Sequence, residues 1–264
     1  MDLNLKGKVV VVTGGAGKAG SIGNTIVLSL AIEGAIPVMI DIDERGNQLQ
    51  SNLLSNGHES LFIQADVTNP EAVQSAINTI VKKYNCIDVL INNVGVNDGM
   101  GLDSSLDQFM NSLKLNLASY FLLAKYSLPY LIKSKGNILN IGSKVAITGQ
   151  GGTSAYAAAK GGVLALTREW AVDLIQHDIR VNALVIAESW TPAYKEWIDT
   201  DDNGAEKLES IKSGIPLEKR MTAPEEIADN ALFLISDKSS HTTGQHVFVD
   251  GGYVHLDRSL LTDK

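Results

Sequence analysis

The sequence predicts a single α/β domain built on a doubly wound, parallel sheet of about seven strands. Seven short runs rich in Val and Ile alternate along the chain with longer segments of helical periodicity. The strand-like runs are almost continuously apolar, as expected for strands that helices cover on both faces. A glycine-rich stretch, VVTGGAGKAGSIGNTIVLSLA, joins the first strand-like run to the first helical segment. In sheets of this kind, ligands bind beyond the carboxyl ends of the strands.

The predicted elements follow one another in regular alternation. The strand runs end at turn or polar residues and cover 8–14, 36–42, 60–67, 86–95, 136–143, 179–186 and 244–252. Helical patterns cover 22–33, 43–55, 70–84, 105–134, 155–177 and 224–236. Because strands and helices alternate, we expect right-handed crossovers between parallel strands.

Residues 187–215 interrupt this alternation. The segment is polar, contains Trp190 and Trp197, and follows the carboxyl end of a predicted strand. An insertion at that position is typical of a lid over a binding site. The alternative is a surface excursion whose aromatic rings pack on the domain. No linker, repeat or charge block divides the rest of the chain, so we expect one domain over residues 1–264.

Composition excludes several classes of partner. The chain has a net charge of −8 and no Lys/Arg cluster, which disfavours nucleic acid and anionic membranes. A single cysteine, Cys86, excludes an internal disulfide and a thiolate metal cluster, and we expect no metal site. No apolar segment is typical of a signal peptide or a membrane span. We therefore expect a cytoplasmic protein that binds a small molecule.

Two glycine patterns compete within the glycine-rich stretch. Gly15, Gly17 and Gly20 match the GxGxxG pattern of dinucleotide-binding loops. The apolar face of the following helix favours another register; this face comprises Ile22, Ile26, Val27, Leu30 and Ala31. It makes Ser21 the N-cap and puts Gly23 in the first helical turn.

The second register predicts a lengthened phosphate loop. Gly14 begins the tight turn, and residues 15–20 make the loop about three residues longer than the fingerprint needs. A pyrophosphate would lie at the helix N-terminus, where backbone N–H groups attract anions. The stretch therefore predicts a Rossmann-like dinucleotide site, and the role of Lys18 in the loop stays open.

The first carboxylate after the second strand is Asp41. A carboxylate at this place accepts hydrogen bonds from both ribose hydroxyls and repels a 2′-phosphate, which favours NAD. Lys18 and Arg45 are basic residues near it, so NADP is the alternative cofactor.

A tyrosine and a lysine lie four positions apart in TSAYAAAKGG, as Tyr156 and Lys160. On a helix this spacing puts both on one face. A phenol with a pKa near 10 is a poor base at neutral pH, and an adjacent ammonium favours the phenolate. Ser143 ends an upstream strand, where its hydroxyl can hold a substrate oxygen. Asn116 lies inside a predicted helix although Asn is a mediocre helix former.

These motifs, in this order, resemble the short-chain dehydrogenase/reductase family along nearly the whole chain. The matching stretches are VTGG, Asp41, ADV, INNVG, Asn116, Ser143, YAAAK, IRVNA and TGQHVFVDGG. The resemblance implies that Tyr156 is the acid/base and that Lys160 lowers its pKa and binds the nicotinamide ribose. It implies further that Ser143 orients the substrate oxygen and that Asn116 holds a water in a proton relay beyond Lys160.

The resemblance also implies a set of cofactor contacts. Asp66 would meet the adenine, Asn92 would lie beside the cofactor, and Thr191 would meet the carboxamide. The full set is Gly14, Ser21, Ile22, Gly23, Asp41, Asp66, Val67, Asn92, Val94, Gly95, Tyr156, Lys160 and Thr191. Two departures concern the phosphate contacts and the substrate pocket: SIG stands after a longer spacing where the family has GIG, and Ile186-Ala187 replaces Pro-Gly.

A narrower resemblance connects the chain to the bacterial L-fucose dehydrogenase-like group. It is carried by NIGSKVAITGQGGTSAYAAAKGG, AESWTPAYKEWI and GGYVHLDR. It implies oxidation of an aldose at its anomeric carbon to a lactone with NAD(P). Polar side chains beside aromatic rings suit a sugar. The candidate substrate contacts are Ser143, Lys144, Gln150, Thr153, Glu188 and Trp190.

Two other functions remain open at this point. A keto-sugar or uronate reductase would use the same four catalytic residues in the opposite direction. A non-catalytic dinucleotide sensor would share the fold, although such proteins tend to lose the Tyr or the Lys. The family resemblance also implies a homotetramer formed through the helix of Tyr156 and the last strand, with residues 251–264 reaching a neighbouring subunit or fraying.

Overall fold

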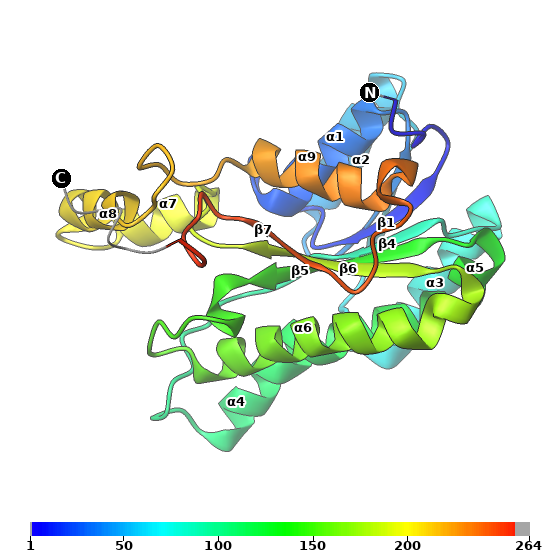
Figure 1. Cartoon of the computed structure of the whole chain (residues 1–264). Coiled ribbons are helices and arrows are strands. Elements are labelled where there is room, and N and C mark those ends of the chain that lie inside the picture. The colour runs from blue at the N-terminus through cyan, green and yellow to red at the C-terminus, as the bar shows by residue number, and fades with distance from the viewer. Residues whose placement is uncertain (1, 257–264) are drawn as a thin grey trace.

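The computed structural model describes residues 2–256, in which helices cover both faces of one seven-stranded sheet (Figure 1). Every strand pairing is parallel, and the strand order is β3-β2-β1-β4-β5-β6-β7. The predicted doubly wound fold is confirmed. The order reverses between β1 and β4, and the carboxyl ends at this switch point are where such sheets bind ligands.

The strands and helices at the predicted positions fall within the predicted ranges or begin one residue outside them. The strands are β1 Val9–Thr13, β2 Ile36–Asp41, β3 Leu61–Gln64, β4 Val89–Asn92, β5 Asn137–Ser143, β6 Arg180–Ile186 and β7 His246–Val249. The helices are α1 Ile22–Ile32, α2 Arg45–Ser55, α3 Pro70–Tyr84, α4 Leu106–Leu113, α5 Ser119–Ser134, α6 Ser154–Leu174, α7 Pro192–Asp199, α8 Gly204–Ser213 and α9 Pro224–Ile235. The predicted helix 105–134 is divided into α4 and α5, and two further helices, α7 and α8, lie in the predicted insertion.

Two apolar clusters fill the two sides of the sheet. Val10 and Val12 of β1 point to the side of α1 and α9, whereas Val9 and Val11 point to the side of α3, α5 and α6. This division follows from the strand geometry, because successive side chains face opposite sides of the sheet. Figure 1 shows the two helical layers above and below the strands.

A chain of buried polar side chains joins the centre of the sheet to α6. Asn92 donates to Asn140 at 2.9 Å, and Asn140 donates to Thr167 at 3.0 Å. The Thr167 hydroxyl in turn donates to the Val163 carbonyl at 2.8 Å. All three side chains are fully buried. Because a buried polar group without a partner is costly, this chain fixes α6 relative to β4 and β5.

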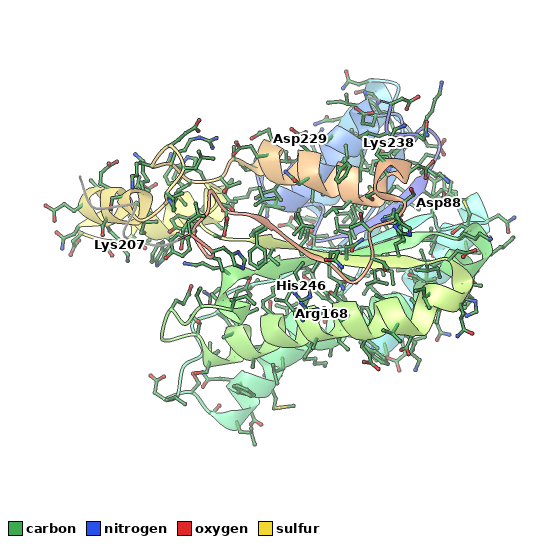
Figure 2. All side chains as sticks on the ribbon, viewed as in Figure 1. Asp88, Arg168, Lys207, Asp229, Lys238 and His246 are labelled. Carbon is green, nitrogen blue, oxygen red and sulfur yellow. The ribbon has the colours of Figure 1, made fainter. Side chains whose placement is uncertain are left out.

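The predicted insertion at 187–215 forms α7 and α8, which project beyond the carboxyl ends of β5 and β6 (Figure 1). Figure 2 shows Lys207 on this projection and Asp88 at the opposite end of the sheet. The base of the insertion is tied to residue 222. Trp190 N donates to the Thr222 carbonyl, and Thr222 N donates to the Glu188 carbonyl, both at 3.0 Å.

Residues 2–256 contain neither a membrane-spanning helix nor a cluster of metal ligands. No helix in this range has the length and apolar character needed to cross a membrane. No group of three or more His, Cys, Asp or Glu side chains in the same range could hold a metal ion.

Replacing the central residue of the buried polar chain should destabilise the fold. We expect Asn140→Leu to lower the free energy of unfolding by roughly 2–4 kcal/mol, because the Asn92 amide and the Thr167 hydroxyl lose their partner. Urea denaturation measures this change. The control is Thr79→Ala, whose hydroxyl bonds the Ser75 carbonyl on an exposed face of α3 and should matter by less than about 0.5 kcal/mol. Equal urea midpoints for Asn140→Leu and the wild type would show that the polar chain does not hold α6.

Candidate active site

The first helix begins at Ile22, so the register based on Ser21 is confirmed. Ser21 has extended backbone angles (φ −73°, ψ 156°), and its hydroxyl accepts a hydrogen bond from Asn24 N at 3.4 Å. The loop backbone wraps closely around this cap, since a Cβ on Gly17 would lie 2.6 Å from Ser21 Oγ. The GxGxxG match at residues 15–20 therefore lies in the loop and does not open the helix.

Gly14 and Gly23 bring the loop and the helix into direct contact. Gly14 has a left-handed backbone (φ +67°), and its carbonyl oxygen occupies the space that a Cβ on Gly23 would need. Asn93 completes the contact, because its Nδ2 donates to the carbonyls of Thr13 at 2.9 Å and Gly14 at 3.2 Å. Gly23 therefore serves the close packing of the helix N-terminus beneath the loop.

Asp41 ends β2 and also supports the glycine-rich loop. Its Oδ2 accepts a hydrogen bond from Ala16 N at 2.9 Å, and its Oδ1 accepts one from Asp43 N at 3.1 Å. The two basic residues near it have carboxylate partners: Arg45 pairs with Asp43, and Lys18 pairs with Glu196 of α7. Hydrogen bonds from Arg45 hold the pKa of Asp43 at about 2.

This part of the site fits a nicotinamide dinucleotide. The N-terminus of α1 has no acidic residue in its first turn, which suits a pyrophosphate. Each Asp41 oxygen accepts one protein hydrogen bond, and a carboxylate oxygen has further acceptor capacity for ribose hydroxyls. On the adenine side, Asp66 Oδ1 accepts a hydrogen bond from Thr68 N at 2.8 Å, and Val67 is buried in the core.

The other cofactor candidates differ in what their side chains do. Asn92 is turned into the sheet towards Asn140, so a cofactor contact from this residue would have to come from its backbone. Val94 contributes its carbonyl to Tyr120. Thr191 is the N-cap of α7, and its hydroxyl accepts a hydrogen bond from Tyr194 N at 3.2 Å.

Tyr156, Lys160 and Ser143 come together at the carboxyl end of β5. Lys160 Nζ lies 5.6 Å from the centre of the Tyr156 ring, one turn away on α6. The lysine is 2% exposed, and its Nζ donates to the Ile141 carbonyl and to the Tyr120 hydroxyl, each at 2.9 Å. Ser143 is the last residue of β5 and is buried.

Burial acts in opposite directions on the two titratable groups. It raises the pKa of Tyr156 to about 12; the hydrogen bond with Ser143 opposes this shift and the charge of Asp98 adds to it. Burial lowers the pKa of Lys160 to about 7. Each charge alone is therefore costly in this site, whereas a phenolate and an ammonium formed together stabilise each other. Ionisation of Tyr156 therefore costs least while Lys160 is charged.

Asn116 lies in a π-helical turn, Lys114–Ala118, between α4 and α5. Its Oδ1 accepts a hydrogen bond from Val96 N at 2.8 Å, and its Nδ2 donates to the Val96 and Ser112 carbonyls at 3.0 and 3.1 Å. It holds the loop after β4 against the helical segment formed by α4 and the π-helical turn. A Cβ on Gly95 in this loop would lie 3.2 Å from Lys160 Nζ and 3.3 Å from Asn116 Oδ1, so a side chain there would crowd both groups.

Two predicted substrate contacts bind each other. Lys144 and Glu188 form an ion pair, and both side chains are largely buried. Tyr194 of α7 donates to Glu188 Oε2 at 2.7 Å, and burial together with this carboxylate raises the pKa of Tyr194. Lys144 Nζ also lies 4.4 Å from the centre of the Tyr253 ring. The cluster joins the residue after Ser143 to α7 and to the segment that follows β7.

The remaining residues predicted to contact the substrate are at least partly exposed to solvent. Gln150 is exposed, Thr153 is partly buried, and Trp190 is 41% exposed with its ring 6.4 Å from that of Tyr194. Trp190 and Thr191 also line a hollow of about 720 Å³ between the insertion and residues 220–225. Neither Ser143 nor Tyr156 belongs to the walls of this hollow, so it is separate from the catalytic residues.

Comparison with known proteins agrees with this geometry. A family model described as enoyl-(acyl carrier protein) reductase matches residues 15–254. The L-fucose dehydrogenase of Mus musculus is 37% identical over 93% of this chain and 88% of its own length. The 3-oxoacyl-(acyl-carrier-protein) reductase FabG of Thermotoga maritima is 36% identical over 96% of this chain and 100% of its own length. The chain belongs to the short-chain dehydrogenase/reductase family.

Solved structures of other short-chain dehydrogenases/reductases share the whole fold. The crystal structure of Cj0485 dehydrogenase has a TM-score of 0.93, 42% identity and full coverage of both chains. That of Thermoplasma acidophilum aldohexose dehydrogenase has a TM-score of 0.87, 30% identity and coverage of 97% of this chain and 98% of its own. This short-chain dehydrogenase/reductase is therefore an NAD(P)-dependent oxidoreductase that acts on a small-molecule substrate.

Sequence reasoning missed three residues of this short-chain dehydrogenase/reductase site. Tyr120 lies four residues after Asn116, so helical spacing alone could have placed it near the same face. Asn93 directly follows Asn92, and strand alternation turns its side chain to the other side of β4. Tyr194 lies in the predicted lid, and no local pattern singles it out.

The contact between Gly23 and Gly14 can be tested through cofactor affinity. We expect Gly23→Ala to weaken binding of NAD and NADH by at least roughly tenfold, because the new methyl group would displace the phosphate loop. Isothermal titration calorimetry measures both affinities. The control is Gly149→Ala in an exposed loop, where an added Cβ meets nothing within 4 Å. Unchanged affinity in Gly23→Ala would show that the loop can shift without affecting the cofactor.

Proposed function

We propose that the enzyme oxidises an aldose of the L-fucose type at its anomeric carbon, forming a lactone, with NAD as the preferred cofactor. The observation that carries this proposal is the meeting of Tyr156, Lys160 and Ser143 at the carboxyl end of β5, next to the Lys144–Glu188 pair. The first three residues supply acid/base chemistry. The ion pair offers charged groups near a polyhydroxylated substrate.

Each catalytic side chain has one task in this reaction. The Ser143 hydroxyl orients the anomeric oxygen, and the Tyr156 phenolate accepts the proton of the anomeric hydroxyl. Lys160, once charged, favours that phenolate. The C1–H bond breaks as the C1–O bond gains its double-bond character, and a nicotinamide held beside Tyr156 and Lys160 would accept the hydride. Asn116 keeps the loop after β4 and thereby the surroundings of Lys160 in place.

Two observations support NAD over NADP. Asp41 presents a carboxylate at the end of β2, and a 2′-phosphate beside it would be repelled. The nearby cations are already paired, Lys18 with Glu196 and Arg45 with Asp43. Ser21, Ile22 and Gly23 would hold the pyrophosphate at the start of α1, and Thr191 would meet the carboxamide.

A sugar substrate is supported by the relatives and by the walls of the site. Both the L-fucose dehydrogenase of Mus musculus and the aldohexose dehydrogenase of Thermoplasma acidophilum bear sugar-related names. The FabG relative is almost as similar, and its name indicates an acyl substrate. Lys144, Glu188 and Tyr194 form one charged, hydroxyl-bearing cluster. We propose that this cluster faces the substrate, where it would suit a sugar better than an acyl chain. Gln150 and Trp190 complete the proposed substrate contacts.

Of the two alternative functions considered from the sequence, one remains a candidate and one is set aside. A keto-sugar or uronate reductase would use the same residues in the opposite direction and remains the second candidate. The non-catalytic sensor is set aside because the family consists of oxidoreductases and both Tyr156 and Lys160 are present.

The proposal includes the surroundings of the site. Residues 187–215 act as a lid, and β7, at the edge of the sheet, contributes with α6 to a homotetramer. The predicted contact of the C-terminal tail with a neighbouring subunit concerns residues 251–264, of which 257–264 lie outside the described residues.

Tyr156 and the substrate are tested together by initial rates. We expect oxidation of L-fucose with NAD to exceed that with NADP and to exceed reduction of a deoxy-keto-uronate with NADH. Tyr156→Phe should lower kcat by roughly a thousandfold, because the proton acceptor is lost, while calorimetry shows NAD affinity nearly unchanged. Retained turnover in Tyr156→Phe would refute the acid/base assignment. Turnover of acyl thioesters and not of sugars would refute the substrate class.

A further inference from the structure

The catalytic lysine has a second tyrosine beside it. Tyr120 of α5 is 1% exposed, and its hydroxyl oxygen lies 2.9 Å from Lys160 Nζ. The same hydroxyl lies 3.0 Å from the Val94 carbonyl oxygen and 3.1 Å from that of Ile141. A single hydroxyl therefore connects the loop after β4, the strand β5 and the helix α6.

The chemistry of these groups determines the direction of the hydrogen bonds. Carbonyl oxygens only accept, so the Tyr120 proton is donated to Val94 or Ile141. A lysine ammonium only donates, so the Tyr120 oxygen accepts from Lys160. Charged Lys160 then has two neutral acceptors in the protein, the Tyr120 hydroxyl and the Ile141 carbonyl. Hydrogen bonds that accept from a charged donor are stronger than those between neutral groups.

We propose that Tyr120 is a positioning residue: it fixes the ammonium of Lys160 and favours its charged form, so that Tyr156 can ionise near neutral pH. The proposal rests on the acid/base role proposed for Tyr156. It assigns Tyr120 no contact with the substrate.

Tyr120 is not a second acid/base. Burial, with the charge of Tyr156 as a smaller cause, raises the pKa of Tyr120 well above its ordinary value, so the phenol stays neutral. Its other partners are the backbone carbonyls of Val94 and Ile141, which do not pass on a proton. A proton passed from Lys160 to Tyr120 could therefore go no further than these carbonyls.

Few other groups act on the charge of Lys160. Tyr156 faces it from α6, and Asp98 acts on Tyr156. Asn116 and Ser143, the other polar side chains nearby, are neutral. The shift of the Lys160 pKa has burial as its cause, with no carboxylate among residues 2–256 contributing. The hydroxyl of Tyr120 is therefore one of the two protein acceptors that stabilise the ammonium, and the only one from a side chain among the described residues.

The test is Tyr120→Phe, which keeps the ring and removes only the hydroxyl. For sugar oxidation, we expect the rising limb of the pH profile of kcat/KM to move up by roughly one pH unit and the rate at pH 7 to fall roughly tenfold. At high pH, where Tyr156 ionises without help, the rates should converge. A merely structural role would lower the rate by the same factor at every pH, and that result would overturn the proposal.

The matched control is Tyr84→Phe in α3. The Tyr84 hydroxyl is also buried and has no hydrogen-bond partner among the described residues. Its removal should leave the pH profile unchanged. An equal shift in both variants would overturn the proposal, because the effect would then not depend on the contact with Lys160.

A second measurement does not depend on the substrate. In protein labelled with ¹³C at the lysine Cε, the signal of Lys160 is assigned by its loss in Lys160→Met and titrated in the wild type and in Tyr120→Phe. We expect the midpoint to fall by roughly one pH unit in the variant. An unchanged midpoint would overturn the proposal. If no sugar is oxidised by the wild type, the proposed function fails, and this titration still decides the role of Tyr120.

Discussion

The burial of the Lys160 ammonium against the carbonyl of Ile141 is the constraint on which the rest of the site depends. A buried lysine needs acceptors at fixed positions, so α6 must lie close to β5. The chain from Asn92 through Asn140 to Thr167 holds the helix there. Gly95 allows the neighbouring loop to approach, since a side chain at this position would crowd the ammonium. The position of the lysine thus depends on how α6, β5 and the loop after β4 pack against one another.

The lengthened glycine-rich loop contacts the insertion. Lys18 near the middle of the loop pairs with Glu196 of α7, and a Cβ on Gly20 would lie 3.9 Å from Pro192 at the start of that helix. The added residues therefore meet α7 while Ser21 keeps its place as the helix cap. The exposed ion pair contributes little stability by itself. Its significance is that the phosphate loop and the insertion touch.

Sequence reasoning succeeded where a local pattern has one physical meaning. Apolar runs and helical periodicity predicted the sheet, the apolar face after Ser21 located the first helix, and the spacing of Tyr156 and Lys160 put both on one face. It did not predict contacts between residues that lie far apart along the chain. Lys144 and Glu188 were each predicted as substrate contacts, and the ion pair that joins them across 44 residues was not predicted. Helical spacing could place Tyr120 near Asn116, but its contact with Lys160, which lies far from it along the chain, arises from the crossing of α5, β5 and α6. The π-helical turn Lys114–Ala118 around Asn116 was not predicted either.

The central claim is that the charge of Lys160 allows Tyr156 to act near neutral pH, and Lys160→Met tests it most directly. The measurement is kcat for oxidation of a substrate that the wild type turns over, at saturating cofactor and across the pH range in which both proteins stay folded. We expect the rising limb of the profile to move up by roughly two pH units in the variant, because the phenolate loses its ammonium. Rising limbs at the same pH in the wild type and in Lys160→Met would contradict it.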